Sequence, residues 1–253
     1  MGEPYGMWLP INLGEGTAII DQLINWIHVF MVVLFVGWGI FYIQWIVRFR
    51  KSVHPQAIYE PVKGQFSKAV EVAVVIIEAI LLIGLSMPAW ARLRTEPPSA
   101  PDLTVRVVAQ QFAWNVHYPG PDGKFGPTSP ELIDEATNPV GLDRDHADAQ
   151  DDVVEINNLY VPVGKEVLIR LTTKDVIHSF TVPVLRLKQD ALPGMEVPVW
   201  FKAAETGTYE IACAQLCGIS HFRMRGMIHI QSDEEFQTYL EGAGEEEFFE
   251  EEE

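Results

Sequence analysis

Two long apolar stretches in the first 90 residues constrain the fold of this chain more than any other feature. The first, from Leu23 to Val47, has no charged residue, and the second, from Val72 to Trp90, has only Glu78. A helix needs about 20 apolar residues to cross a bilayer. We therefore predict two transmembrane helices, over about 22–47 and 70–90, rather than core helices of a soluble protein.

The charges that flank these stretches predict the orientation of the helices. No Lys or Arg precedes Arg48, and the first apolar run is too long for a signal peptide, so cleavage there is disfavoured. The segment between the stretches carries five basic residues: Arg48, Arg50, Lys51, Lys63 and Lys68. Because cytoplasmic loops are enriched in Lys and Arg, we expect this segment inside and the N-terminus, with everything after Trp90, outside.

The part of the chain after Trp90 is strongly acidic. It carries 13 Lys and Arg against 29 Asp and Glu, a formal charge of −16. This charge argues against nucleic acid as a partner, since binding phosphates requires basic patches. It favours a cationic partner, because a field of one sign speeds association with the opposite sign. The run EEEFFEEEE after Gly244 is typical of a disordered tail.

Short alternating segments between Leu103 and Gln231 predict an all-β domain behind the two helices. They read LTVRVVAQQFAWNVHY, VVEINNLYVP, EVLIRLTT, HSFTVPV, VPVWFKA, GTYEIAC and GMIHIQ, with turns rich in Gly, Pro and charge between them. Such a series indicates a β-sandwich or barrel. The helix expected next, SDEEFQTYL, can begin with a capping box formed by Ser232 and Glu235.

The segment 119–152 interrupts the strand pattern. It contains five prolines, four glycines and nine acidic residues, which predict a long surface loop. Its DRDHADAQDD run invites a calcium site, but the glycine and glutamate spacing of an EF-hand is missing. We interpret the run as a solvated acidic loop.

The stretch CAQLCGISHFRM, from Cys213 to Met224, holds both cysteines of the chain. An extracytoplasmic disulfide is the first interpretation, and a zinc site with His178 and His221 is the second. Zinc leaves Met224 without a role, whereas sulfur and imidazole donors together favour copper. A mononuclear blue-copper site needs a single cysteine. The second cysteine is explained if both thiolates bridge two copper ions, each with one histidine and one weak ligand.

At this point the chain resembles subunit II of the haem–copper cytochrome c oxidases, which carries the dinuclear copper A centre. DVIHSFTVP and KQDALPG resemble the segment of the family's first histidine ligand, and CAQLCGISHFRM matches its C-x-x-x-C-G-x-x-H-x-x-M motif. The resemblance implies a membrane-anchored all-β protein: a transmembrane hairpin, then a cupredoxin-like β-sandwich or barrel. It also implies the ligands: bridging Cys213 and Cys217, terminal His178 and His221, the weak ligand Met224 and the main-chain carbonyl of Gln215.

The same resemblance predicts the boundaries of the parts. We expect the N-terminal segment and hairpin over 1–92 and the copper A domain over 93–232, with the acidic loop inside it. A short helix and the acidic tail should occupy 233–253. Asp175, three residues before His178, is placed to support the ligand segment.

Three positions depart from the family pattern or extend it. Gln215 replaces a Glu that helps bind a magnesium or manganese ion at the subunit interface, so that second metal is doubtful. Where the family accepts electrons through a Q-W-x-W motif, this chain has Phe112 and then Trp114. Glu71 matches a glutamate at the mouth of a proton path. Glu78, two helical turns later, either extends that path or pairs with a basic or hydroxyl group of subunit I in a structural role.

The function implied is electron transfer in a terminal oxidase of a prokaryotic plasma (inner) membrane, with the copper domain on the extracytoplasmic side. Electrons would come from a separate c-type cytochrome or similar carrier, since no C-x-x-C-H haem motif occurs. They would pass to haem in subunit I, for oxygen reduction coupled to proton pumping, alongside further oxidase subunits. Rival interpretations are a quinol oxidase, which lacks the copper ligands, a nitrous oxide reductase, which needs no hairpin, and a membrane-tethered copper-delivery protein.

Overall fold

The computed structural model describes the chain except for residues 1–8, 58, 60–63 and 247–253. The chain divides into a helical unit, Ala18–Thr95, and a β unit that joins residues up to Thr17 to those from Glu96 onward. Residues 9–17, which we expected with the hairpin, thus fall in the β unit. Most of the expected acidic tail, and Lys63 of the basic loop, lie outside the described residues.

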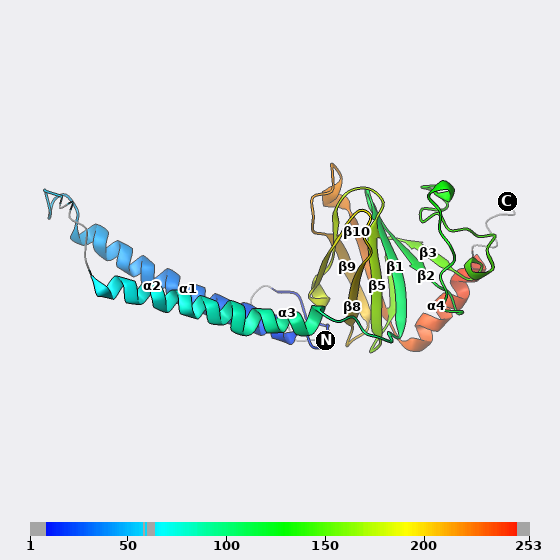
Figure 1. Cartoon of the computed structure of the whole chain (residues 1–253), viewed down its shortest axis with the longest axis horizontal. Coiled ribbons are helices and arrows are strands. Elements are labelled where there is room, and N and C mark those ends of the chain that lie inside the picture. The colour runs from blue at the N-terminus through cyan, green and yellow to red at the C-terminus, as the bar shows by residue number, and fades with distance from the viewer. Residues whose placement is uncertain (1–8, 58, 60–63, 247–253) are drawn as a thin grey trace. The chain divides into compact units, whose positions relative to one another are not determined.

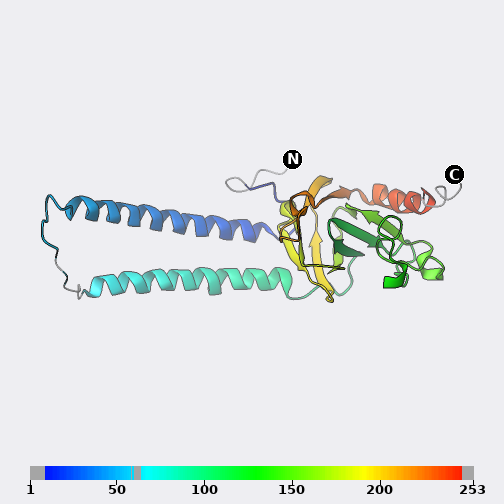
Figure 2. The ribbon, with the colours of Figure 1, turned by 90° about the horizontal axis from the view of Figure 1, so that it is seen from above.

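The helical unit contains two helices long and apolar enough to cross a membrane, Ala18–Arg48 and Gln65–Arg94. The first is α1, and the second consists of α2 (Gln65–Ala79), a π-helical segment η1 (Ile80–Ser86) and α3 (Met87–Arg94). They run in opposite directions as a hairpin (Figure 2). Both extend beyond the expected ranges, because polar and charged residues continue the helices past the apolar cores.

The π-helical segment has a local cause in Pro88, the second residue of α3. Proline lacks an N–H and its ring clashes with the carbonyl four residues earlier, here that of Gly84. The preceding turn widens instead, and the N–H of Met87 donates to the carbonyl of Leu82, five residues back. The apolar pattern predicted one regular helix and gave no sign of this wider turn.

The β unit is a sandwich of two five-stranded sheets, ordered β3-β2-β1-β5-β8 and β4-β10-β9-β6-β7 (Figure 1). The strands are β1 Leu103–Gln110, β2 Ala113–Tyr118, β3 Val153–Ile156, β4 Asn158–Pro162, β5 Glu166–Thr173, β6 His178–Val182, β7 Leu187–Ala191, β8 Val197–Lys202, β9 Gly207–Cys213 and β10 Arg225–Gln231. Alternate side chains face a shared core, as Val167, Ile169 and Leu171 do in β5. The expected fold class, a helical hairpin followed by a β-sandwich, is confirmed.

Two segments that read as single strands each form two. LTVRVVAQQFAWNVHY is the antiparallel hairpin β1–β2. VVEINNLYVP places β3 in one sheet and β4 in the other. The division falls at Asn157, which adopts the left-handed conformation with φ 63°. Its N–H donates to the carbonyl of Trp114, and its side-chain oxygen accepts the Trp114 N–H at 2.9 Å.

The segment 119–152 contains no named strand but is more than the surface loop we expected. Its apolar residues Val140, Leu142 and Ala149 form a small cluster of their own. A buried pair, His117 Nε2 and Asp152 Oδ2 at 2.6 Å, joins the end of the segment to β2. Charged residues dominate the composition of the segment, so the composition did not predict the cluster formed by its few apolar residues.

Both ends of the β unit are held by specific contacts. Before α1, the N–H of Leu13 donates to the Val184 carbonyl at 2.7 Å, and the Leu13 carbonyl accepts the Ala204 N–H at 2.8 Å. After β10, helix α4 (Asp233–Glu246) begins with the expected capping box. The N–H of Ser232 donates to the Glu235 carboxylate at 2.9 Å, and the N–H of Glu235 to the Ser232 hydroxyl at 3.3 Å.

Candidate metal centre

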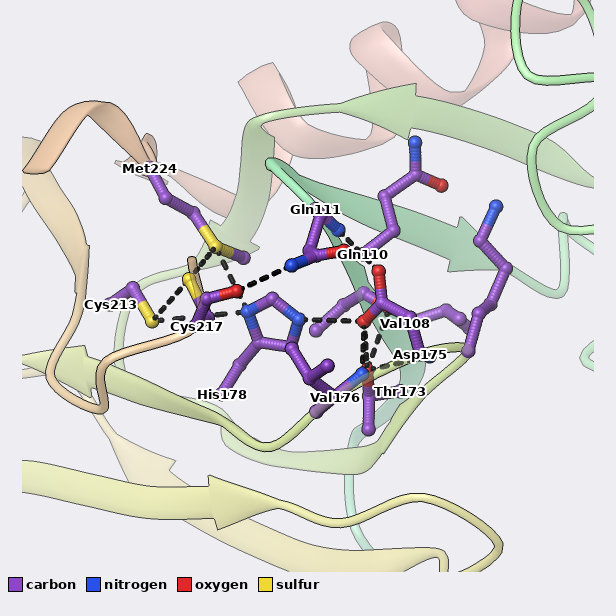
Figure 3. A network of polar contacts seen from close by, with 12 residues as sticks. Val108, Gln110, Gln111, Thr173, Asp175, Val176, His178, Cys213, Cys217 and Met224 are labelled. Carbon is purple, nitrogen blue, oxygen red and sulfur yellow. Dashed lines mark hydrogen bonds and ion pairs between the residues drawn. The ribbon is translucent and has the colours of Figure 1, made fainter. Parts of the chain in front are cut away.

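Two neighbouring strands of one sheet bring the candidate ligands together. His178 is the first residue of β6 and Cys213 is the last residue of β9, and these strands pair antiparallel. The chain then forms a loop that carries Gln215, Cys217 and His221 and ends at Met224, just before β10. The pairing of β6 with β9 therefore places His178 beside the sulfur of Cys213 (Figure 3).

The sulfur atoms lie at the centre of the cluster. The Sγ atoms of Cys213 and Cys217 are 3.8 Å apart. The Nδ1 atom of His221 lies 3.6 Å from the Cys217 sulfur, and Nδ1 of His178 lies 3.9 Å from the Cys213 sulfur. The two cysteines are thus flanked by one imidazole each, as two bridging thiolates would require. Both are free thiols here, so the disulfide interpretation is not realised.

Two weaker donors complete the arrangement. The Met224 sulfur lies 3.1 Å from Nδ1 of His178, and the Gln215 carbonyl oxygen lies 3.1 Å from the Cys213 sulfur. The structure therefore gathers all six of the expected ligands. Such a set, with two thiolates, two imidazoles and a thioether, fits copper better than zinc, for which the methionine has no role.

Burial and hydrogen bonding prepare the histidine for a metal. The His178 side chain is fully buried, and its Nε2 lies 2.8 Å from Oδ1 of Asp175. A carboxylate accepts, so Nε2 carries a proton, and Nδ1, which faces the sulfurs, would have to be unprotonated to bind a metal. Burial acts to raise the pKa of Asp175, but hydrogen bonds, led by the one from His178, outweigh it. The net pKa is lowered, so the carboxylate stays ionised.

The two thiols have different acidities. Burial alone would raise the pKa of Cys213, but hydrogen bonds, led by the one with His178, lower it to about 6. Burial and the neighbouring charge of Cys213 raise the pKa of Cys217 to about 11. Cys213 is therefore the more acidic of the two thiols, and both would have to lose their protons to bind a metal as thiolates.

The aromatic candidates occupy different environments. Trp114 is fully buried, and its ring makes edge contacts with His178, at a centroid distance of 6.1 Å, and with Phe180 at 5.3 Å. Phe112 is partly buried and packs against the core of the sandwich beside Gly218 of the ligand loop. Neither placement tests a role in accepting electrons, so both residues stay predictions.

The acidic candidates Glu71 and Glu78 both lie in α2, and both are exposed in this single chain. Their place in the helix agrees with the expected spacing of two turns. No described contact of either residue tests a role in proton uptake.

Sequence reasoning missed two features of the site. Three apolar side chains between the ligands, those of Leu216, Ile219 and Phe222, are 76–91% exposed and form an apolar rim. Their interleaving with the ligands was a readable signal. Gln111 is the first residue of the segment compared with the Q-W-x-W motif. The hydrogen bond from its side-chain amide to the Cys217 carbonyl, at 2.6 Å, was not predicted because it spans 106 positions.

Comparisons with known proteins identify the family to which this chain is similar. Residues 103–231 match the family model described as "Cytochrome C oxidase subunit II, periplasmic domain". The "Alternative cytochrome c oxidase subunit 2" of Bradyrhizobium diazoefficiens is 35% identical over 242 residues, which cover 92% of this chain and 83% of that one. The "Cytochrome c oxidase subunit 2" of Cereibacter sphaeroides is 30% identical, over 87% of this chain and 76% of the relative.

One solved structure with a similar sequence is the periplasmic domain of subunit II of cytochrome oxidase (CoxB) of Bradyrhizobium japonicum. It is 32% identical, with a TM-score of 0.45, and the match covers 60% of this chain and 99% of the solved one.

Proposed function

This chain belongs to the cytochrome c oxidase subunit II family, and on that premise we propose that its clustered donors hold two copper ions that transfer single electrons. The family establishes a membrane-anchored, copper-binding electron-transfer subunit with an extracytoplasmic domain, part of an oxidoreductase complex. The observation that carries the finer proposal is the pair of sulfurs 3.8 Å apart with one imidazole on either side.

The residues of the chain supply the binding and the rigidity. A bound copper pair supplies a one-electron redox couple. The Cys213 and Cys217 thiolates, the His178 and His221 imidazoles, the Met224 thioether and the Gln215 carbonyl would hold the pair. Ligands fixed by paired strands move little when the charge of the site changes, so the sandwich keeps the geometry ready for electron transfer. We propose residues 93–232 as the domain that carries this site.

The direct test is the metal content and the EPR spectrum of the full chain. We expect a copper-to-chain ratio of two and a spectrum of one electron shared between two nuclei. Cys217→Ser should abolish that spectrum, whereas Met224→Leu should retain copper and shift its potential, since an axial ligand tunes more than it holds. One labile copper per chain would contradict the proposal and support a copper-delivery protein.

The acidity of the extracytoplasmic part supports a basic donor. We propose that a separate c-type cytochrome, or a similar carrier with a basic face, delivers the electrons near Phe112 and Trp114. Exposed charges are screened over about 8 Å at physiological salt, so oxidation of the donor should slow as ionic strength rises. A rate that stays constant would indicate apolar docking instead, provided that the donor is shown to dissociate between turnovers.

Subunit I is the proposed acceptor, through its haem, in an oxidase of a prokaryotic plasma membrane that pumps protons. We propose that Glu71 and Glu78 of α2 form a path by which protons reach it. An intramembrane carboxylate is costly against lipid and is expected to face protein or water. Glu71→Gln should slow turnover while copper reduction stays normal. Glu78→Gln should do the same if Glu78 relays protons, and it should loosen the contact with subunit I if the role of Glu78 is structural. Full turnover and intact assembly in Glu78→Leu would exclude both a relay and a structural role for Glu78.

The second metal of the family is proposed to be weak or absent. The Gln215 side chain is exposed and neutral, so it offers no charged oxygen to magnesium or manganese. Cells grown with excess manganese should yield little protein-bound manganese signal, and Gln215→Glu should increase it. Stoichiometric manganese in the wild type would show that other carboxylates provide the site.

A further inference from the structure

Gln111 lies in the turn between β1 and β2 and contacts both ligand-bearing segments of the metal centre. Its side-chain amide nitrogen donates to the Cys217 carbonyl, and its backbone N–H donates to Oδ2 of Asp175, each at 2.6 Å. Oδ1 of the same carboxylate accepts from Nε2 of His178 at 2.8 Å. One residue is therefore linked to the cysteine loop directly and to the histidine strand through a carboxylate (Figure 3).

The chemistry of these contacts fixes their direction. A carbonyl oxygen only accepts, so the amide nitrogen of Gln111, not its oxygen, must face Cys217. Asp175 uses separate oxygens for Gln111 and for His178, so the two bonds do not compete. Asp175 also accepts the Val176 N–H at 2.6 Å, which ties it to its own segment. The turn and the two ligand segments thus form one hydrogen-bonded unit.

Gly218 provides an independent sign that the turn is seated on the ligand loop. A Cβ at this position would lie 2.7 Å from Nε2 of Gln111 and 3.0 Å from the Phe112 ring. Its φ of +139° also disfavours any side chain. Gly218, directly after Cys217, therefore lacks a side chain at the place where Gln111 and Phe112 approach it.

We propose that Gln111 is a positioning residue that holds the cysteine loop and the His178 strand in register for the metal. The inference rests on the proposed copper function. The hydrogen bond from the Gln111 amide to the Cys217 carbonyl restricts the backbone of Cys217. The Gln111 backbone N–H orients the Asp175 carboxylate, which in turn orients His178. Partners of this kind, one step removed from the ligands, typically contribute about 10- to 100-fold to metal affinity.

The test replaces the amide without emptying its space. Gln111→Met keeps the length of the side chain and the backbone N–H but removes the donor to Cys217. In the copper-loaded full chain in detergent, we expect a chelator to remove copper at about 10- to 100-fold lower concentration. We also expect a changed copper EPR spectrum and a shifted reduction potential, which a general loss of stability would not produce.

Gln110→Met is the matched control. The side-chain oxygen of Gln110 accepts from Nδ2 of Asn115 at 2.9 Å, within the β1–β2 hairpin. No described hydrogen bond links Gln110 to a candidate ligand. This variant should lower the unfolding temperature but leave the spectrum and the chelator midpoint of the wild type. Equal effects of the two variants on the spectrum would overturn the proposal, as would an unchanged spectrum and affinity in Gln111→Met.

Gly218→Ala tests the same contact from the opposite side. The added methyl should displace the Gln111 amide and reproduce the spectral change, and the effects of Gly218→Ala and Gln111→Met should not add. Additive effects would show that the two residues act separately and would overturn the proposal. If the wild-type chain bound no copper at all, the proposed function would fail together with this inference; normal wild-type loading isolates the inference.

Discussion

The helical hairpin and the β-sandwich distribute their apolar side chains in opposite ways. In the sandwich, Ile169, Leu171 and Phe180 are fully buried, whereas in α1 Val33 and Phe35 are 64% and 81% exposed. Each unit follows the same physical rule in a different solvent: apolar surface leaves water in the sandwich and meets hydrocarbon in the hairpin. Exposure of a side chain is therefore interpretable only once the surrounding medium is identified.

The two units also treat their polar groups differently. The sandwich buries the hydrogen-bonded pair His117 and Asp152 and closes the start of α4 with a capping box. Helix α2 begins at Gln65, and the preceding Gly64 provides no side-chain cap. A long apolar helix in lipid is held by its own backbone bonds and by the medium, while a short helix in water needs its ends satisfied. Four substitutions test this contrast.

The largest effect is expected inside the sandwich. Asp152→Ala removes the oxygen that accepts from His117 and from the Gly126 N–H, and the two buried donors left unsatisfied should reduce the free energy of unfolding by about 2–6 kcal/mol. Denaturant titration of the full chain in detergent, followed by near-UV circular dichroism, measures it. Glu131→Ala removes an exposed carboxylate from the same segment and should change stability little. Similar losses in both variants would refute the importance of burial here.

A core truncation should follow closely. Leu171→Ala opens a cavity in the fully buried core and should cost about 2–5 kcal/mol in the same titration. Ile40→Ala in α1 removes a similar volume from a side chain that is 63% exposed, and it should leave the unfolding of the sandwich unchanged. A comparable destabilisation by Ile40→Ala would mean that α1 packs as a core helix rather than against lipid.

The third substitution tests the medium around α1. Val33→Arg places a charge at the middle of the helix, at a cost of about 2.5–3.5 kcal/mol for membrane insertion. The fraction of chain that resists alkaline extraction from membranes should fall. Leu132→Arg, at an exposed position of the sandwich, should not change it. Unaltered integration of Val33→Arg would argue that α1 does not span the bilayer.

The smallest effect concerns the capping box. Ser232→Ala removes the hydroxyl that accepts the Glu235 N–H and should destabilise α4 by about 1 kcal/mol. Faster amide hydrogen exchange in the first turn of α4 measures this. Ser67→Ala, in the first turns of α2, provides the comparison and should leave exchange in that helix unchanged. Loss of protection in both helices would erase the distinction between them.

Local patterns in the sequence predicted what depends on neighbours along the chain. The apolar runs, the alternation of β5 and the Ser232–Glu235 spacing each describe contacts within a few positions. The expected ligands from Cys213 to Met224 lie within one short loop, so spacing alone grouped them. His178 was a candidate donor by its residue type, and the resemblance to a known family assigned it to the copper site. Local spacing could not show its place beside Cys213, because that place depends on sheet pairing.

The features that escaped prediction depend on distant partners or on single residues. Asn157 divides a strand because its left-handed backbone is satisfied by Trp114, 43 positions away. The contacts of Gln111 span 64 and 106 positions. Pro88 widens a helical turn that any apolar pattern would describe as regular. Alternation and hydropathy contain no record of such pairings, which arise only when the sheets assemble.

The contacts of the short segment before α1 constrain how many times the chain crosses the membrane. Leu13 is hydrogen-bonded to Val184 and to Ala204 of the sandwich, and Gly14 forms a bridge with Ala203. Points of a chain that touch directly occupy the same aqueous compartment, so the chain between them must cross the bilayer an even number of times. The two candidate spans, Ala18–Arg48 and Gln65–Arg94, satisfy this parity without reference to any charge rule. In a variant that lost one span, either the Leu13 contacts would break or the sandwich would lie on the cytoplasmic side of the membrane.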